Sequence, residues 1–491
     1  MQQLACLTSV IALLPVIATA AGRAVPLIDA VKQSNLPQVR VLLQQRADVN
    51  APEPDGSTAL HWAAHRGDVK AVDLLVRAGA RHLSNRYGVT PLSLAAENGH
   101  AVVVERLLRS GANPNAALDG GETVLMTAAR RGRADVVKAL IEAGADVNAR
   151  EATRGQTALM WAAGEGHADV IRALLAHGAD IKATSHAPSS PKNITDGDSA
   201  YLRVAPRVDV CTPLQFAVHA GQREAAKVLL DAGADINDET PHGMGLLTLA
   251  IANAHFDVAA LLIETGADVN QRNVGWTPLH QVVRVRTLNI GWGPPHPQPS
   301  GRLTSLDVAK LLLQHGADVE AGTTKPWQER RFSPGFGATP LFLAAKGGDV
   351  EMMWLLASHG ADVMAINANK TTVLMAAAGV EMSNPNEDSG QEADGLAALQ
   401  VAMQLGAGDI NAVNSAGDTA LHGAMGRVSP EPARLLAESG AKLDARNRRG
   451  LMPIEIAAGG AAVGGSRPET ARMLRELMRT RGLTPPAVKR E

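Results

Sequence analysis

The fifteen histidines of this chain are the side chains best able to bind a transition metal or move a proton near neutral pH. A zinc site requires three or four ligands that converge on one point. Six histidines are scattered: His65, His82, His186, His219, His242 and His296. Nine recur at fixed places of a repeated sequence: His61, His280 and His422; His100, His167 and His255; His177, His315 and His359. Recurrence of this kind indicates hydrogen bonds to neighbouring turns, so we expect no metal site.

The spacings that organise other chemistry do not occur either. The sequence contains no H-E-x-x-H, C-x-x-C, G-x-x-x-x-G-K-[ST] or G-x-S-x-G. The glycine-rich stretches GEGHAD (164–169) and GWGPPH (291–296) are incomplete as nucleotide-binding loops. Asp196 and Asp198 resemble the start of a calcium loop that lacks its distal glutamate. We therefore predict no catalytic residue, no cofactor and no enzymatic activity.

Composition sets further limits on function. The net charge of −2 gives no general electrostatic reason to expect nucleic acid as a partner. Aromatic residues make up only 3%, so Leu, Ala and Val must fill the core. Of the two cysteines, Cys6 lies in the N-terminal apolar segment and Cys211 would remain alone in the mature chain, which allows no intramolecular disulfide.

The N-terminal segment resembles an export signal. Leu4 to Ala21 carries no charge, and Ala18-Thr19-Ala20 fits a signal-peptidase site. We expect residues 1–20 to be cleaved near Ala20-Ala21 and the protein to be periplasmic or secreted. A membrane anchor is the alternative, although the run is short against the ~20 residues that a span requires.

Most of the remaining chain repeats one sequence frame. Residues 121–149 read GETVLMTAARRGRADVVKALIEAGADVNA, and 155–183 read GQTALMWAAGEGHADVIRALLAHGADIKA. A glycine closes each copy, and the steps between Gly79, Gly111, Gly144 and Gly178 are 32, 33 and 34 residues. Further copies lie at 56–80, 88–116, 211–237 and 245–270, and others start at Gly275, Gly337, Lys370 and Gly417. A period of this length predicts stacked units that cannot bury their apolar faces alone.

The positions of the frame predict a pair of helices and a turn. In TPLH (277–280) the threonine caps a helix and the proline takes its first position. Gly67, Gly99, Gly132 and Gly166 end first helices in the left-handed conformation. The second helix has apolar residues at helical spacing, and ADVN then enters a polar turn.

These motifs, T-P-L-H-x-A-A, then G-H, then L-L-x-x-G-A-D-V-N, resemble the ankyrin repeat. The resemblance covers about residues 25–480 and implies an all-α solenoid of about twelve units with short β-hairpin turns. It also implies a concave surface that binds protein. We expect one solenoid over 21–480 and a polar tail at 481–491.

Four insertions depart from the frame, at 184–209, 285–304, 321–337 and 380–395. Long loops in compact proteins are often functional, and exposed aromatic side chains favour a contact role. Trp292, His296, Trp327 and Phe332 are the candidate contact residues of the insertions. The alternative is that these rings fold back and pin their own loops on the solenoid. Because repeats interact mainly with their neighbours, deletion of 286–304 is expected to cost little stability.

The resemblance places the concave surface at the end of each first helix. The corresponding residues are His65, Arg66, Glu97, Asn98, Arg130, Arg131, Glu165, His219, Arg284 and Lys346. This set leans basic, so it would steer a partner with an acidic face. An ordinary solvated helix face is the alternative.

The sequence therefore favours an exported, monomeric, non-enzymatic scaffold that binds a protein partner. Two alternatives remain: a small-molecule or enzymatic site built by the insertion loops, and a structural spacer in the cell envelope.

Overall fold

The computed structural model describes residues 25–186, 210–241, 243–287, 299, 301–325, 336–381, 392–460 and 465–486. They form two compact units, which divide the chain between residues 235 and 236: the N-terminal unit (25–235) and the C-terminal unit (236–486). Both are helical. In the described ranges, the extended pairing outside helices consists of three isolated antiparallel bridges, which join Ala117 to Thr123, Glu239 to Gly245 and Ile366 to Thr372.

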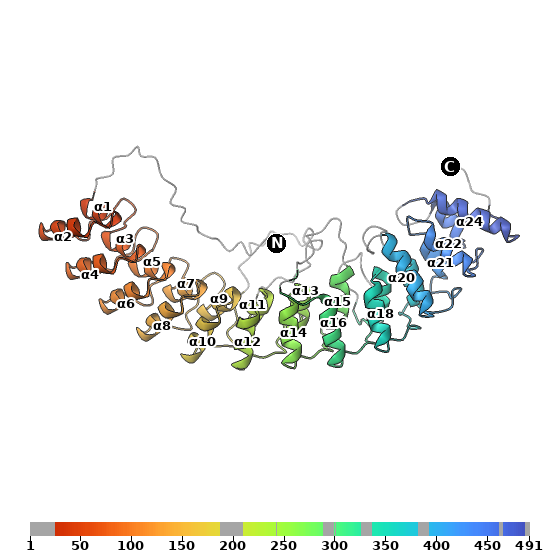
Figure 1. Cartoon of the computed structure of the whole chain (residues 1–491), viewed down its shortest axis with the longest axis horizontal. Coiled ribbons are helices and arrows are strands. Elements are labelled where there is room, and N and C mark those ends of the chain that lie inside the picture. The colour runs from red at the N-terminus through yellow and green to blue at the C-terminus, as the bar shows by residue number, and fades with distance from the viewer. Residues whose placement is uncertain are drawn as a thin grey trace. The chain divides into compact units, whose positions relative to one another are not determined.

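The N-terminal unit consists of helix pairs stacked in two rows (Figure 1). The first helices of successive pairs pack on one another as an inner row, and the second helices do the same as an outer row. The inner helices are α1 (Pro26–Lys32), α3 (Ala59–His65), α5 (Pro91–Asn98), α7 (Val124–Arg130), α9 (Ala158–Glu165) and α11 (Pro213–His219). The outer helices are α2 (Leu36–Gln44), α4 (Val69–Arg77), α6 (Ala101–Arg109), α8 (Ala134–Glu142), α10 (Ala168–Ala176) and α12 (Arg223–Asp231).

The C-terminal unit repeats the two-row arrangement, and two of its outer helices, α20 and α24, are longer than the others. Its inner helices are α13 (Leu246–Ala252), α15 (Pro278–Thr287), α17 (Pro340–Gly347), α19 (Val373–Ala378), α21 (Ala420–Ala424) and α23 (Pro453–Glu455), which continues into η1 (Ile456–Gly460). The outer helices are α14 (Phe256–Glu264), α16 (Ser305–Gln314), α18 (Val350–Ser358), α20 (Glu392–Gln404), α22 (Glu431–Glu438) and α24 (Pro468–Thr480).

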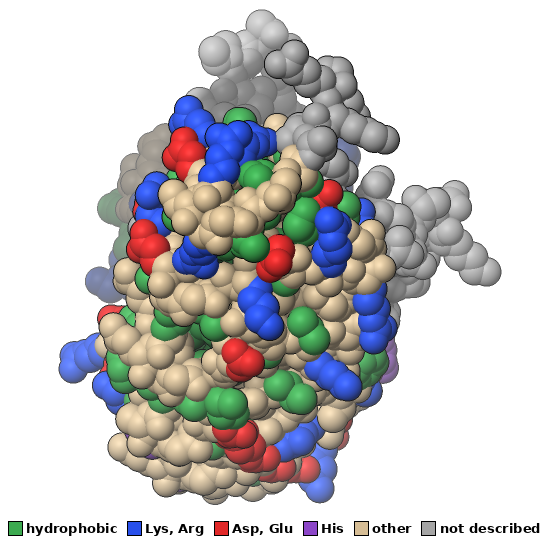
Figure 2. Space-filling model, turned by 90° about the vertical axis from the view of Figure 1, so that its right-hand side faces the viewer, with side chains coloured by type: hydrophobic (Ala, Val, Ile, Leu, Met, Phe, Trp, Pro, Cys, Tyr) green, Lys and Arg blue, Asp and Glu red, His purple; other side chains and the backbone are tan. Residues whose placement is uncertain are grey.

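Helix α24 closes the C-terminal unit. Its buried side, with Ala471, Leu474 and Met478, packs on the elements before it, while Arg472 and Arg479 remain exposed. Figure 2 looks onto this end and shows basic side chains distributed over it, with acidic and apolar ones between them. Polar side chains of this kind suit a helix face that no other described repeat covers.

The helix ends follow the sequence frame and add an inter-repeat contact. Gly67 and Gly132 have φ of 69° and 69°, as their left-handed positions require. A Cβ at Gly67 would also lie 2.6 Å from Nδ1 of His100, and one at Gly132 would lie 2.7 Å from Nδ1 of His167. Glycine is therefore required at these positions for two reasons. Its backbone adopts a positive φ, and the histidine ring of the next repeat lies where a Cβ would be.

The histidine of the TPLH position joins the start of its own helix to the following repeat. Nδ1 of His280 lies 3.2 Å from the Thr277 backbone nitrogen, which donates to it. Nε2 of His280 lies 3.0 Å from the carbonyl oxygen of Ala338 in the next repeat. His61 and His422 contact Val89 and Leu451 in the same way. These contacts use a neutral ring, with Nδ1 as acceptor and Nε2–H as donor.

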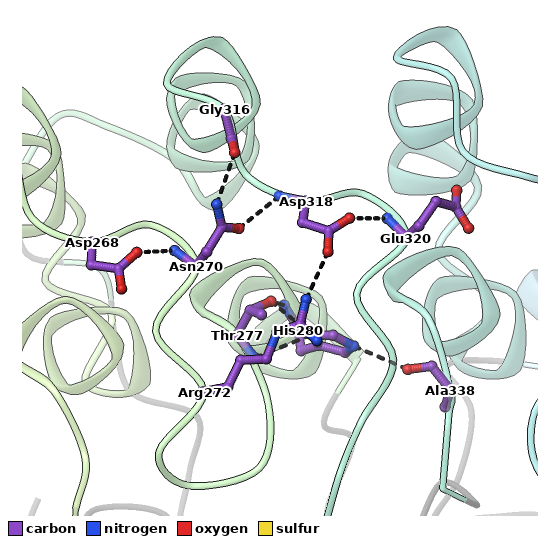
Figure 3. A network of polar contacts seen from close by, with 9 residues as sticks. All are labelled: Asp268, Asn270, Arg272, Thr277, His280, Gly316, Asp318, Glu320 and Ala338. Carbon is purple, nitrogen blue, oxygen red and sulfur yellow. Dashed lines mark hydrogen bonds and ion pairs between the residues drawn. The ribbon is translucent and has the colours of Figure 1, made fainter.

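An asparagine at the entrance of the turn forms a second link between repeats (Figure 3). The Asn270 side chain donates to the Gly316 carbonyl at 2.9 Å and accepts from the Asp318 backbone N–H at 2.7 Å. Asp268 holds the asparagine in place by accepting from the Asn270 N–H at 2.8 Å. Asn50, Asn115, Asn148 and Asn411 make the same pair of bonds to the repeats that follow them.

We predict that Asn270→Ala lowers the free energy of unfolding of the C-terminal unit by about 1–2 kcal/mol, since two hydrogen bonds across repeats are lost. Met364 occupies the equivalent position in a later repeat with 55% of its surface exposed. Met364→Ala is therefore the matched control and should change stability by less than about 0.5 kcal/mol. Equal effects of both variants in urea titrations would show that the asparagine link is not stabilising.

Burial lowers the pKa of His280 from 6.5 to about 4. The unfolded chain therefore binds the proton more readily between these values. His280 stabilises the fold fully above pH 6.5, and this contribution, about 3 kcal/mol, is lost as the pH falls toward 4. His280→Gln should remove this pH dependence and keep the cap, because Gln215 already caps α11 in the same position. Parallel stability curves for the two proteins from pH 7 to 4 would contradict the prediction.

Candidate partner-binding surface

The inner row of the N-terminal unit presents a column of half-exposed apolar side chains. Trp62, Leu94, Trp161 and Phe216 occupy the same position of α3, α5, α9 and α11, and each is partly exposed. The intervening helix α7 has the buried Thr127 at this position. In the C-terminal unit the same position holds Leu249, Gln281 and Leu343, which are 0%, 3% and 7% exposed. The open apolar column is thus a property of the described N-terminal unit. We call these four residues the inner column.

Cations hold the two tryptophans of the inner column in place. The Lys32 ammonium lies 4.3 Å from the centroid of the Trp62 ring, and the Trp62 indole N–H donates to Glu53 at 2.7 Å. The Arg130 guanidinium lies 5.2 Å from the Trp161 ring centroid. Rings held in this way lose little conformational entropy when a partner covers them.

The polar residues predicted for this surface are brought together in pairs across neighbouring repeats. Arg131 and Glu97 form an ion pair of 2.8 Å, and the Asn98 amide lies 3.1 Å from Nδ1 of His65. Arg66 is exposed and donates to Ser34 at 2.9 Å. Glu165 is exposed on α9, and His219 is half-exposed at the end of α11.

Arg130 also forms an ion pair of 3.0 Å, with Glu122 of its own repeat. Part of the predicted positive charge is therefore compensated within the protein. Charge reversal at Arg130 would place a carboxylate beside Glu122 and would disturb the fold as well as any binding.

Two predicted residues do not lie on an exposed surface. Arg284 of α15 is 9% exposed and Lys346 of α17 is 7% exposed. Both sit at the frame position that is open in the N-terminal unit, but in the C-terminal unit this position is buried. The frame identifies a position in a repeat, whereas exposure depends on what the rest of the chain places over it.

The candidate residues of the insertions, Trp292, His296, Trp327 and Phe332, lie outside the described residues, as does the N-terminal segment 1–20. Parts of all four insertions are described, and in two of them a described part is helical. Helix α15 continues to Thr287, inside 285–304, and α20 begins at Glu392, inside 380–395.

The insertion at 285–304, here the proline-rich insertion, is fixed to neighbouring repeats at its two described ends, which we call its roots. At the first root, the Arg286 guanidinium donates to Asp349 at 2.9 Å and to Glu351 at 3.0 Å. Burial by itself lowers the pKa of Arg286, but these two carboxylates raise it above its usual value. At the second root, Asp257 accepts from the backbone N–H groups of Arg302 and Leu303 at 3.1 and 3.0 Å.

The described residues offer no group of three or more His, Cys, Asp or Glu side chains that could hold a metal ion. In the same ranges, no helix has both the length and the apolar character needed to cross a bilayer.

The inner column was not predicted from the sequence. Trp62 precedes Arg66, the residue that caps the C-terminus of α3, by four residues, or about one helical turn. Both therefore lie on the same face of α3. The recurrence of bulky apolar residues at one frame position was the available signal. It also fits a core position, and only the exposure of these side chains distinguishes the two.

A family model described as "Ankyrin repeats (3 copies)" matches residues 27–118, 103–185, 214–290 and 300–386, more than half of the chain. The chain is 34% identical over 97 residues to protein phosphatase 1 regulatory subunit 27 of Mus musculus, covering 19% of this chain and 63% of that protein. It is 34% identical over 111 residues to a putative ankyrin repeat protein of Rickettsia felis, covering 22% of this chain and 45% of that protein. It is 30% identical over 262 residues to ankyrin repeat and SOCS box protein 16 of Homo sapiens, covering 53% and 50%. Each match thus covers less than two thirds of the relative.

The fixed roots change the expected effect of removing the proline-rich insertion. A deletion of 286–304 would remove Arg286 and also Thr304, which caps α16. We predict that it destabilises the C-terminal unit by about 3 kcal/mol or more. Replacement of 288–300 alone by a glycine-serine linker of equal length should change the free energy of unfolding by less than about 1 kcal/mol. Equal stabilities of the two variants in urea titrations would contradict the role given to the roots.

Proposed function

Because the chain belongs to the ankyrin-repeat family, we propose that it is an exported, non-enzymatic scaffold that holds a protein partner on the inner column of its N-terminal unit. Ankyrin repeats act as scaffolds for protein–protein interaction, and solenoids use extended surfaces of this kind for binding. The observation that carries the proposal is the set of half-exposed apolar side chains at one position of α3, α5, α9 and α11, two of which are tryptophans with a cation over the ring.

The side chains on this surface indicate what kind of partner would bind there. Tryptophan and arginine are the side chains that most often dominate protein interfaces. An apolar segment of the partner would cover the inner column, and carboxylates beside it would meet Arg66 and Arg131, both of which are exposed. The ion pair of Arg131 with Glu97 is a surface pair and can be exchanged at little cost.

Export rests on the apolar run from Leu4 to Ala21 and the Ala18-Thr19-Ala20 site. A periplasmic or secreted monomer is the form that we propose. A site made by the insertion loops would depend on Trp292, His296, Trp327 and Phe332, and a spacer would need no open column. The column therefore favours binding over both alternatives.

The proposal is tested by placing a photoreactive amino acid at Leu94, at the centre of the inner column, in cells of the source organism. One stoichiometric adduct is expected there and none at Val102, which is 54% exposed away from the column. With the recovered partner, Trp62→Ala and Phe216→Ala should each weaken binding about thirtyfold or more. Val102→Ala and Tyr87→Ala are the controls, and losses as large in these variants would contradict the proposal.

A further inference from the structure

Exposed apolar side chains gather on the turns that precede the inner helices of the C-terminal unit. Ten large hydrophobic residues are exposed in the described ranges, and four of them lie on adjacent turns: Phe336, Met364, Ile366 and Val413. They are 53%, 55%, 54% and 56% exposed. Ile366 and Val413 occupy the same frame position, where the repeat before them has Gly322 and two other repeats of the unit have Arg272 and Arg446. The apolar residues thus replace polar ones at a position on the protein surface.

Backbone hydrogen bonds hold these turns side by side. The Ala368 N–H donates to the Phe336 carbonyl at 2.7 Å, and the Ser415 N–H donates to the Asn369 carbonyl at 2.7 Å. The Arg448 N–H donates to the Ala416 carbonyl at 2.9 Å, which adds the next turn. We call the tips of these turns, with the four apolar residues, the turn ridge.

The turn ridge carries positive charge at its tips. Lys370, Arg448 and Arg449 are exposed there. Carboxylates also lie close to the ridge, and they keep their negative charge while they accept hydrogen bonds within the turns. Asp362 accepts from the Met364 N–H at 2.8 Å, and Glu381 accepts from Asn367, Asn369 and Thr371 at 3.0, 3.0 and 2.7 Å. The ridge therefore combines protruding apolar side chains with cations.

We propose that the turn ridge adsorbs to the surface of an anionic lipid bilayer. Apolar side chains that project from loop tips can enter the boundary between headgroups and acyl chains, and neighbouring Lys and Arg side chains are attracted to anionic headgroups. A protein partner would need a complementary surface of about 1,000 Å² or more, whereas a bilayer accepts a few separate protruding side chains. This contact is adsorption and not a membrane span, and it is independent of the partner on the N-terminal unit.

The experiment measures co-sedimentation of the full chain with two kinds of vesicle, pure phosphatidylcholine and phosphatidylcholine with about one-third phosphatidylglycerol. Stronger binding to the anionic vesicles is expected, with loss of binding in about 0.5 M salt. Ile366→Asn with Val413→Asn, and Lys370→Glu with Arg448→Glu, should each weaken this binding about tenfold or more. Circular dichroism and thermal melting establish that each variant remains folded.

Matched controls separate the ridge from the rest of the chain. Val41→Asn with Val102→Asn alters residues that are 43% and 54% exposed in the N-terminal unit. Arg46→Glu with Lys70→Glu alters exposed cations there, and Arg46 has a φ of 61°, close to the 60° of Lys370. These controls should bind anionic vesicles like the unaltered chain.

Two results would overturn the proposal. If the ridge variants bind as well as the unaltered chain, lipid contact comes from elsewhere, such as the apolar run from Leu4 to Ala21. If the ridge variants lose a protein partner but keep vesicle binding, the turn ridge is a protein-binding surface.

Discussion

Each helix pair of this protein can bury its apolar sides only against the pairs before and after it. Alignment between neighbours is therefore the constraint on which both units depend. Two polar contacts and one close packing contact set this alignment at different levels of a repeat. Asn270 links the turn to the next outer helix end, His280 links the start of an inner helix to the next turn, and the glycine at Gly67 accepts the ring of His100. A small displacement between repeats would break all three kinds of contact at once.

The same constraint explains where the protein is free to vary. Residues that face a neighbouring repeat are held by these contacts. Side chains on the exposed side of the inner helices and at the tips of the turns are not held by them. The N-terminal unit uses this freedom to expose Trp62, Trp161 and Phe216, and the C-terminal unit uses it to expose Ile366 and Val413. The two units share one frame and present different chemistry to their surroundings.

The need for contacts between neighbouring repeats also limits the insertions. The proline-rich insertion can be added because its roots satisfy the repeats on either side, through Arg286 with Asp349 and through Asp257 with the backbone at Arg302. The inserted residues need not follow the repeat sequence as long as the roots keep their contacts with the neighbouring repeats. Loop closure entropy grows slowly with length, so the cost of the additional chain is small compared with the loss of a root contact.

The sequence by itself determined the repeat, its helix pairs and the residues that cap them. Threonine, proline and glycine act through the local backbone, and their effect depends on few distant residues. It also indicated that the recurring histidines serve neighbouring turns, as His61, His280 and His422 do. Only the tertiary structure decided which of the frame's surface positions are open. Arg284 and Lys346 match the half-exposed His65 in the frame but are buried, while Trp62 and Phe216 resemble core residues but are half-exposed. Exposure depends on what covers a side chain, and residues distant in the sequence supply that cover.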